Sequence, residues 1–490
     1  MPHPFDRYAA FTDVEALKAA SERPLRKSMR VNTLKCSVPE FLEWAAKKGW
    51  TVAPVPWCEE GFFIDREDRH SALGKDLLHL LGHVYMQEAA SMFPVELLDV
   101  QPGHAVLDMA AAPGSKTTQA LAKMGSKGAA AQGVLIANDV QEKRLWTLKA
   151  ALHRSGVTNN IVTKKVGQWF GKQMTERFDR VLCDAPCTAQ GTARKDSDAL
   201  LYSSEENAGK MARLQKEMLE AAIHAAKVGG RIVYSTCTLT PEENEGVIAY
   251  ILNKYSEQVE ALDAGLIAKS GLEKAIEDSH RVQRHIGVGP FPSLRLWPQT
   301  FDTEGFFCAL LHKKAPTRKG ERLPAVRFQE DPVPRSRQRE LEKGLEEAYG
   351  TPFLFPGEQL FQRGTQLILS TEEVSSFHLP VQDYALGMPF GRRLEDTRLR
   401  PDADQATAGR QGRVRIDHEI ATLRGHLATK GVMMITEEMM AVLLDGKDVS
   451  CPPQLRGDIL LNFDGKIVGF GLAKDGLLRN RLPRWMIWKS

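Results

Sequence analysis

The sequence predicts an α/β protein built around a doubly wound, mostly parallel sheet, with a small α/β extension before it and a β-rich region after it. Between about residues 91 and 313, short apolar runs are flanked by turn residues, as expected for strands buried on both faces. Helical stretches such as residues 213–226 separate these runs, and strands that alternate with helices form parallel sheets. Composition then changes at about residue 312, which marks the start of a different region.

Length and composition restrict the class of protein. The 490 residues are enough for about three domains. The net charge is +3, from 65 basic and 62 acidic residues, so any nucleic-acid-binding surface must be a local patch. Seven scattered cysteines favour a reduced, cytoplasmic protein over a disulfide scaffold. The N-terminus has no signal segment and no apolar run approaches the ~20 residues that span a bilayer, so we expect no membrane-bound part.

Residues 1–90 form the predicted α/β extension. Apolar and polar residues alternate over residues 29–34, which predicts a strand. Residues 38–49 have apolar residues at helical spacing and end in Gly49, which predicts an amphipathic helix with a C-terminal glycine.

The predicted sheet of residues 91–313 directs several polar residues to one edge. Its strands are expected at residues 105–109, 133–138, 178–184 and 230–236. Ligands of open α/β sheets bind beyond the carboxyl ends of the strands. The residues that directly follow these four runs are therefore the candidates for a functional site.

The C-terminal part contains a basic segment and a β-rich region. Residues 312–343 hold ten Lys or Arg and five Asp or Glu, so residues 314–349 are either a solvated basic linker or a surface that faces RNA. In residues 350–490, the runs 366–369 and 458–463 predict strands. Residues 474–490 carry five basic residues with Trp485 and Trp488, which suits RNA binding or a packed terminal strand equally well.

The first predicted strand leads into a loop of small residues, AAAPGSKTT from Ala110 to Thr118. Small residues permit a tight turn, and the helix that follows directs free N–H groups at a ligand. A phosphate loop for ATP or GTP needs adjacent Gly and Lys, whereas here Ser115 separates Gly114 from Lys116. Asp139, after the second strand, is predicted to bind ribose hydroxyls or to cap a helix.

Two cysteines follow the third and fourth strands. Cys187 ends the string DAPC that begins at Asp184, and Cys237 lies in YSTCT. Two thiols and a carboxylate at one sheet edge indicate covalent chemistry in which one thiol attacks and the other groups move protons. Thr240, with a proline and an acid after it, predicts a helix start close to Cys237, an environment that favours a thiolate.

Other candidate residues have weaker signals. Asp184 could also cap a helix, and Cys183 with Cys187 does not complete a zinc set, so we expect no metal. The other five cysteines are interpreted as buried small hydrophobes, namely Cys36, Cys58, Cys183, Cys308 and Cys451. Two roles are possible for Arg30, Lys35 and the run Arg194-Lys195-Asp196: contacts to RNA phosphates, or charges that are only solvated.

The ordered strings AAAPGSKTT, ANDV, DAPCTAQGTARKD and YSTCTLTPEENE, preceded by YMQEAASM, carry a family resemblance. Over residues 20–313 the chain resembles the RNA cytosine-C5 methyltransferases of the NOL1/NOP2/Sun group. The resemblance implies a Rossmann-like methyltransferase domain at residues 91–313 and S-adenosylmethionine as the cofactor. The C-terminal extension implies a PUA-like RNA-binding module within residues 350–490, and a target cytosine in the decoding region of 16S rRNA, in naked RNA or in the 30S subunit.

The resemblance also assigns residue roles. It makes Cys237 the nucleophile, Cys187 the group that assists product release, and Asp184 a contact to cytosine N3 and to the cofactor. It implies a cofactor site made of Ala110, Ala111, Ala112, Pro113, Gly114, Ser115, Lys116, Asp139, Val166 and Asp184. The chain departs from the family at Ala110, Ser115 and Val166, where Cys, Gly and Asp are usual. The side chain of Val166 cannot accept a hydrogen bond from the adenine amino group.

Three alternatives remain open. The same chemistry could act on a tRNA or on another rRNA cytosine. A DNA cytosine methyltransferase would use the Pro-Cys thiol as the nucleophile, and the additional Thr236-Cys237 pair argues against it. A non-catalytic assembly factor is opposed by the intact thiols and Asp184. We expect a monomer that does not act on DNA, and a target base that leaves its stack before Cys237 can reach it.

Overall fold

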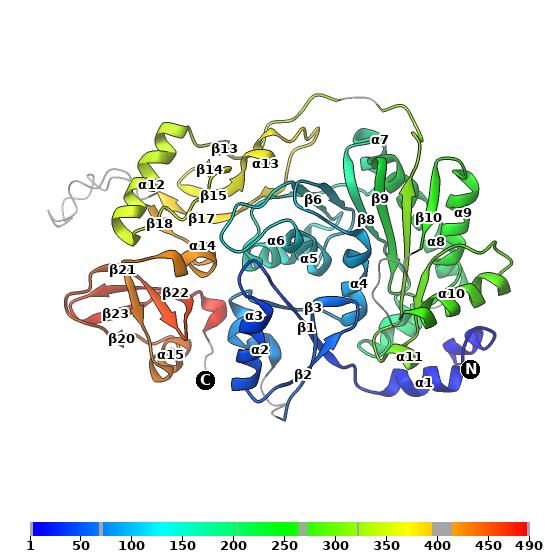
Figure 1. Cartoon of the computed structure of the whole chain (residues 1–490), viewed down its shortest axis with the longest axis horizontal. Coiled ribbons are helices and arrows are strands. Elements are labelled where there is room, and N and C mark those ends of the chain that lie inside the picture. Colours follow the sequence, from blue (N-terminus) through cyan, green and yellow to red (C-terminus); the bar gives the residue numbers. More distant parts are fainter. Residues whose placement is uncertain are drawn as a thin grey trace.

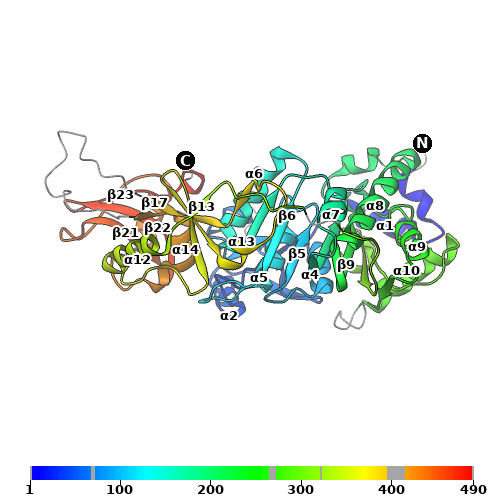
Figure 2. The same ribbon diagram turned by 90° about the horizontal axis from the view of Figure 1, so that it is seen from above.

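The computed structural model describes residues 3–67, 72–202, 204–263, 272–320, 323–393 and 414–487. The molecule is elongated (Figures 1 and 2). The central sheet lies in the middle, the C-terminal sheets lie at one end and the N-terminus lies at the other end. No helix in the described part of the chain is both long and apolar enough to span a bilayer.

The N-terminal extension has a four-stranded sheet in the order β2-β3-β1-β4. The predicted strand and helix are both confirmed, as β1 (Lys27–Val31) and α2 (Val38–Lys47). Gly49 follows α2 with φ +66°, the left-handed conformation that glycine adopts most readily. The other elements are a 3-10 helix (Pro4–Tyr8), α1 (Val14–Glu22), β2 (Thr51–Val55), β3 (Cys58–Asp65), a 3-10 turn (Leu73–Lys75), α3 (Leu77–Leu80) and β4 (Val84–Met86).

The central sheet confirms the predicted doubly wound architecture. Its order is β10-β12-β9-β8-β5-β6-β7-β16, with β11 paired to β12. The five strands β5 to β9 are parallel, and β10, β11, β12 and β16 join through antiparallel pairs. The strands are β5 (Ala105–Asp108), β6 (Val134–Asn138), β7 (Asn160–Thr163), β8 (Phe178–Asp184), β9 (Ala226–Thr236), β10 (Val259–Leu262), β11 (Leu294–Leu296), β12 (Phe306–Lys313) and β16 (Ala385–Leu386).

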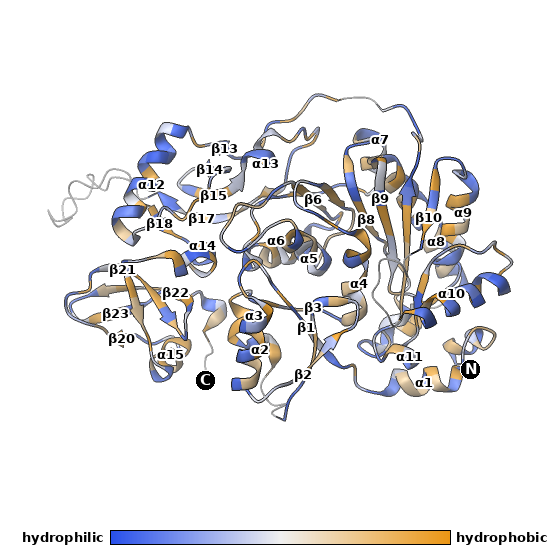
Figure 3. Cartoon of the chain, viewed as in Figure 1, coloured by the Kyte–Doolittle hydropathy of each residue, from blue (hydrophilic) through white to orange (hydrophobic). Residues whose placement is uncertain are grey.

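Helices cover both faces of this sheet. Successive residues of a strand face opposite sides, so Val106 belongs to the core beneath α4 to α6, and Leu107 to the core beneath α7 to α9. Figure 3 shows the hydrophobic residues that run along β8 and β9. The helices are α4 (Ala89–Leu98), α5 (Ser115–Lys123), α6 (Glu142–Ser155), α7 (Gln168–Gln173), α8 (Glu205–Ala225), α9 (Glu245–Lys254), α10 (Glu273–His285) and α11 (Pro298–Phe301), with 3-10 turns at Gln190–Thr192 and Ser197–Tyr202.

Two five-stranded sheets form the C-terminal region, and the strands expected at 366–369 and 458–463 are confirmed as parts of β15 and β21. The first sheet has β13 (Asp331–Pro332), β14 (Glu358–Arg363), β15 (Gln366–Thr371), β17 (Met388–Arg393) and β18 (Val414–Ile416). The second has β19 (Val432–Met434), β20 (Val449–Ser450), β21 (Gly457–Phe463), β22 (Lys466–Lys474) and β23 (Leu477–Asn480). The helices are α12 (Arg335–Tyr349), α13 (Glu372–Ser376), α14 (His418–Arg424) and α15 (Glu437–Leu444), with 3-10 turns at Gly425–Leu427 and Arg484–Met486.

The basic segment contains helix α12. Its Leu341, Leu345 and Tyr349 are buried in the C-terminal core, at the i, i+4, i+8 spacing of an apolar helix face. Charged residues of both signs occupy most of the rest of α12, which made the segment resemble a linker in composition.

The C-terminal region is attached to the other two parts by direct contacts. Strand β16 extends the central sheet through pairing with β7. Lys35 of the N-terminal extension donates to the carbonyls of Leu81 and Arg154, each at 2.9 Å, and to Thr422 Oγ1 at 3.1 Å. The suggestion that Lys35 meets RNA or solvent is therefore wrong, because its side chain is buried where the three parts meet.

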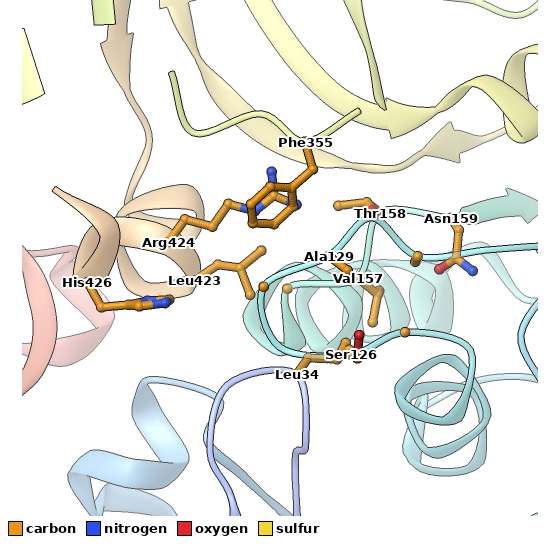
Figure 4. Close-up of a pocket in the computed structure, with 14 residues that line it drawn as sticks. Leu34, Ser126, Ala129, Val157, Thr158, Asn159, Phe355, Leu423, Arg424 and His426 are labelled. Carbon is orange, nitrogen blue, oxygen red and sulfur yellow. The ribbon is translucent and has the colours of Figure 1, made fainter. Parts of the chain in front are cut away.

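A second contact lies beside this junction (Figure 4). Leu423 and Phe355 face loops next to the central sheet, around Ala129 and Val157, and enclose a small cavity of about 30 Å³. The Arg424 guanidinium lies 4.0 Å from the Phe355 ring centroid and pairs with Glu358, so its charge is neutralised within the C-terminal region. We interpret the cavity as a packing gap.

Candidate active site

The loop after β5 forms a turn that positions helix α5. Gly114 is the residue before α5 and has φ +109°, and a Cβ there would lie 3.1 Å from Ala151 and from Leu148 of α6. Both the backbone conformation and the space thus favour glycine. Gly114 has no side chain to cap α5, so the N-terminus of this nine-residue helix directs N–H groups out of the sheet edge.

Asp139 lies directly after β6, at the predicted edge. Its side chain is 2% exposed. Oδ1 accepts a hydrogen bond from the Gln141 N–H at 2.9 Å, while Oδ2 accepts none and lies 3.3 Å from the Arg144 guanidinium. A buried carboxylate oxygen without a hydrogen-bond donor indicates a place for a ligand hydroxyl. Asp139 does not cap α6 with its side chain, because Gln141 precedes that helix.

Asn138 and Arg144 belong to this edge but were not assigned roles from the sequence. The Asn138 amide donates to the carbonyls of Met109 and Lys165 and so connects the ends of β5, β6 and β7. Arg144 donates to the Ala112 carbonyl of the loop. Asn138 lay within the string ANDV, whereas Arg144 had no local signal because its partner lies 32 residues away.

Asp108, the last residue of β5, is another site residue that the sequence did not assign. Burial raises its pKa to about 7, and the hydroxyl of Thr117 donates to its Oδ2 at 2.7 Å. Its Oδ1 is buried without a hydrogen-bond donor. The sequence did offer a signal for Asp108, because an acidic residue ends the strand that leads into the loop of small residues.

Val166 lies in the loop after β7 and is 55% exposed. Its neighbour Lys165 is hydrogen-bonded through its backbone to Asn138, so Val166 lies close to the same edge as Asp139. Its role toward an adenine stays a prediction.

Lys116 and Asp184 form an ion pair across the site. Lys116 Nζ lies 2.8 Å from Asp184 Oδ2, and the hydroxyl of Ser235 donates to Asp184 Oδ1 at 2.7 Å. Burial lowers the pKa of Lys116, but the charge and hydrogen bond of Asp184, together with Cys237 and Asp108, hold it above its ordinary value. A permanent cation therefore lies within electrostatic reach of Cys237.

The two thiols that the sequence placed at one sheet edge are in contact. Cys187 Sγ lies 3.3 Å from Cys237 Sγ, and both residues are half-buried. The pKa of the Cys187 thiol is raised well above its ordinary value by its hydrogen bond to Cys237 and by burial. Cys187 is thus the thiol that keeps its proton. The other five cysteines are buried, as expected.

The predicted helix start after Cys237 is wrong in position. Helix α9 begins at Glu245, with Asn244 before it in a non-helical conformation, and Pro241 and its neighbours form a turn. The carboxylate of Glu243 accepts from the Thr240 hydroxyl but does not cap α9. The positive charge that the structure places near Cys237 is therefore Lys116, and the predicted helix start next to Cys237 does not supply it.

Two further interpretations need correction. Arg194 is not solvated, because its guanidinium donates to the carbonyls of Pro24 and Thr303 and pairs with Asp302, with 1% of the side chain exposed. Arg30 is buried and donates to Gln87 and Thr118. Lys195 is exposed and stays a candidate for RNA contact.

Cys58, Glu60 and Glu96 gather potential metal ligands in the described part of the chain. Lys123 Nζ lies 3.0 Å from Glu96 and 3.6 Å from Glu60. Burial raises the pKa of Cys58 far above the range in which a thiolate forms. We therefore interpret the group as an ion-pair network in which the Lys123 ammonium lies where a metal ion would otherwise bind.

The sheet order and the edge just described define a Rossmann-like methyltransferase. The family model for 16S rRNA methyltransferase RsmB/F matches residues 95–312, and that for the N-terminal domain of 16S rRNA methyltransferase RsmF matches residues 6–89. The chain belongs to this family and is an rRNA methyltransferase.

Individual relatives match nearly the whole chain. Ribosomal RNA small subunit methyltransferase F of Aeromonas salmonicida is 36% identical over 486 residues, which are 98% of this chain and 94% of the relative. The protein of the same name from Psychromonas ingrahamii is 33% identical over 483 residues, 97% of this chain and 93% of the relative. A solved methyltransferase homologue from Pyrococcus horikoshii is 35% identical, with a TM-score of 0.52, over 63% of this chain and 94% of its own.

Proposed function

We propose that this rRNA methyltransferase transfers a methyl group from S-adenosylmethionine to C5 of a cytosine in 16S rRNA, through a covalent bond between Cys237 and C6 of the base. The observation that carries the proposal is the contact between the Cys187 and Cys237 thiols, 3.3 Å apart beside the ion pair of Lys116 and Asp184. C5 of cytosine is too weak a nucleophile to be methylated directly, and a thiolate at C6 makes it reactive.

The residues at the sheet edge fit the cofactor. Asp139 Oδ2 is a buried acceptor without a hydrogen-bond donor and suits a ribose hydroxyl. The free N–H groups at the start of α5 suit a carboxylate. The loop from Ala110 to Ser115 would hold the methionine part, and Val166 would border the adenine. When bound, S-adenosylmethionine supplies the electrophilic methyl group.

The chain's own residues would share the remaining chemistry. Cys237 adds to C6, and the electron pair of the C5=C6 bond is displaced through the ring toward N3. A proton passed from Lys116 through its ion-pair partner Asp184 neutralises the negative charge that develops there. C5 then takes the methyl group. A general base then takes the C5 proton, the C5–H electron pair re-forms the C5=C6 bond, and the C6–S bond breaks with departure of the Cys237 thiolate. Cys187 keeps its proton and lies in contact with Cys237, which suits it to assist this departure.

RNA would be held by surfaces outside the thiol site. Lys474, Arg479, Arg481 and Arg484 are all exposed, as is Trp485, whose ring lies against His418. Buried Leu478, Leu482 and Met486 anchor the same segment, so it both packs and presents its charges. Charged residues bind phosphates and aromatic rings stack on bases, which supports an RNA-binding role for this region. Trp488 lies outside the described residues. The proposal includes a cytoplasmic monomer that acts on 16S rRNA or the 30S subunit.

The test incubates the enzyme with methyl-labelled S-adenosylmethionine and either 16S rRNA or 30S subunits, and maps the methylated base by mass spectrometry. We expect 5-methylcytosine at one position. Cys237→Ala should abolish both methylation and the covalent RNA adduct, whereas Cys187→Ala should accumulate the adduct. An adduct that needs Cys187 and forms without Cys237 would reverse the two roles. Methylation of tRNA in place of 16S rRNA would contradict the proposed substrate.

A further inference from the structure

A buried carboxylate ties the two thiol-bearing loops together. Glu243 is 0% exposed and lies in the turn that follows Cys237. Its Oε2 accepts from the Thr188 N–H at 3.0 Å, and its Oε1 accepts from the Thr188 hydroxyl at 2.5 Å. Thr188 is the residue after Cys187, so Glu243 holds the Cys187 loop from one side.

The other side of Cys187 is held by the same carboxylate through an intermediate. The side-chain amide of Gln215, on helix α8, donates to Glu243 Oε2 and to the carbonyl of Pro186, each at 2.8 Å. Pro186 is the residue before Cys187. Both neighbours of the release thiol are therefore connected to one buried carboxylate, directly at Thr188 and through Gln215 at Pro186.

Cys237 depends less on Glu243, because the hydroxyl of Thr238, the residue after it, donates to Glu243 Oε1 only at the long distance of 3.5 Å. Cys237 follows strand β9 directly, and its carbonyl accepts from the Gly191 N–H at 2.9 Å. Asn244 donates to the Thr238 carbonyl and accepts from the Thr236 hydroxyl, so it fixes the residues on both sides of Cys237. Removal of the Glu243 charge should consequently loosen Cys187 and leave Cys237 in position.

We propose that Glu243 is a positioning residue that holds Cys187 against Cys237 as the protonated, release-assisting thiol. The inference rests on the proposed function for the roles of the two thiols. Charge supports the same conclusion, because Glu243 adds to the hydrogen bond and burial that raise the pKa of Cys187. A negative charge beside Cys187 opposes a second thiolate at that position.

The test compares Glu243→Gln with wild type in two measurements. The first is the covalent adduct formed with RNA and cofactor, which should accumulate because release slows by roughly tenfold, the effect of losing a charged hydrogen bond. The second is alkylation by iodoacetamide without RNA, mapped by mass spectrometry. In wild type Cys237 should react first, and in Glu243→Gln the share of label on Cys187 should rise.

Glu245→Gln is the matched control. Glu245 is equally buried and lies two residues further along, but its carboxylate contacts Arg295 and Ser279 and not the residues that flank Cys187. Both variants should be checked for thermal unfolding and for binding of S-adenosylhomocysteine. If Glu245→Gln reproduces the adduct and the altered labelling, the effect comes from general destabilisation and the proposal is overturned.

Thr188→Val provides a second variant if Glu243→Gln does not fold. It removes the hydroxyl that donates to Glu243 Oε1 and contacts the Thr238 hydroxyl at 2.9 Å, and it keeps the backbone contact to Glu243. Unchanged labelling of Cys187 and unchanged release in both variants would overturn the proposal. The labelling does not require methylation, so it still tests the role of Glu243 if the wild-type enzyme produces no 5-methylcytosine.

Discussion

Lys116 Nζ and Asp184 Oδ2 lie 2.8 Å apart, and this ion pair connects the start of helix α5 to the end of strand β8. The loop that precedes α5 and the loop that carries Cys187 are thereby held at a fixed separation. The same lysine interacts with Cys237, so one cation serves the carboxylate and the thiol. A low-dielectric site makes such a charge more effective than it would be in water.

We predict that Lys116→Met lowers methylation by about 100-fold, the typical cost of removing one charge-stabilising group from an active site. Without the cation, the thiolate of Cys237 loses the stabilising interaction with Lys116. The measurement is the single-turnover rate of methylation together with the rate of Cys237 alkylation at pH 8. Lys123→Met is the control, since Lys123 belongs to the same helix and pairs with Glu96. An unchanged alkylation rate in Lys116→Met would contradict the electrostatic role.

We predict that Asp139→Asn weakens binding of S-adenosylhomocysteine by about 10- to 100-fold, because an amide accepts a hydrogen bond less strongly than a carboxylate does and its NH₂ meets the ligand donor. Isothermal titration calorimetry measures the change. Glu142→Gln is the control, since this exposed acid, three residues further along, pairs with Lys164. Equal affinities of Asp139→Asn and wild type would exclude Asp139 from the cofactor site.

We predict that Val166→Asp tightens cofactor binding by about 3- to 10-fold, because it supplies the acceptor for the adenine amino group that the family usually has. The position is 55% exposed, so the new carboxylate remains solvated in the free enzyme and costs little stability. Calorimetry with S-adenosylhomocysteine tests this prediction. Val228→Asp is the control, because Val228 is also exposed but lies near the start of β9, away from the edge of the sheet that carries the site. Weaker binding in Val166→Asp would mean that the adenine lies elsewhere.

Sequence reasoning predicted the elements whose signal is local. Strand β8 was predicted at residues 178–184, and it spans those residues, because an apolar run between turn residues is sufficient evidence for a buried parallel strand. The sequence likewise predicted that Cys187 and Cys237 lie at the same edge of the sheet, since parallel strands bring their carboxyl ends together. Their direct contact is seen in the structure.

Features that depend on distant partners could not be predicted. Arg30, Lys35 and Arg194 resembled surface charges because the acceptors of their hydrogen bonds lie far away in sequence. The start of α9 was misplaced because the Glu243 carboxylate accepts hydrogen bonds from the Thr240 hydroxyl and from Thr188, so it is not available to cap a helix. The interaction of Lys116 with Cys237 likewise depends on the fold, because 121 positions separate the two residues in the sequence.

We predict that Lys35 makes stability depend on pH between about 7 and 10. Burial lowers its pKa in the folded protein to about 7, with Arg154 acting in the same direction and Glu419 opposing them. In the unfolded chain the ordinary pKa of 10.5 applies. The unfolded state therefore binds more protons in this interval, so the free energy of unfolding rises with pH, by at most about 1.4 kcal/mol per pH unit. Below pH 7 Lys35 is protonated in both states, and the full cost of burying its charge then lowers the free energy of unfolding.

Urea denaturation at several pH values from 6.5 to 9.5 measures this slope. Lys35→Met should reduce the slope relative to wild type, even though the loss of donors to Leu81, Arg154 and Thr422 lowers its stability at every pH. Lys47→Met is the control, because Lys47 is exposed and pairs with Asp464 across the same junction. Identical slopes in Lys35→Met and wild type would show that Lys35 keeps its proton throughout the interval. The two carbonyls and the hydroxyl that accept its hydrogen bonds would then offset the effect of burial on its pKa.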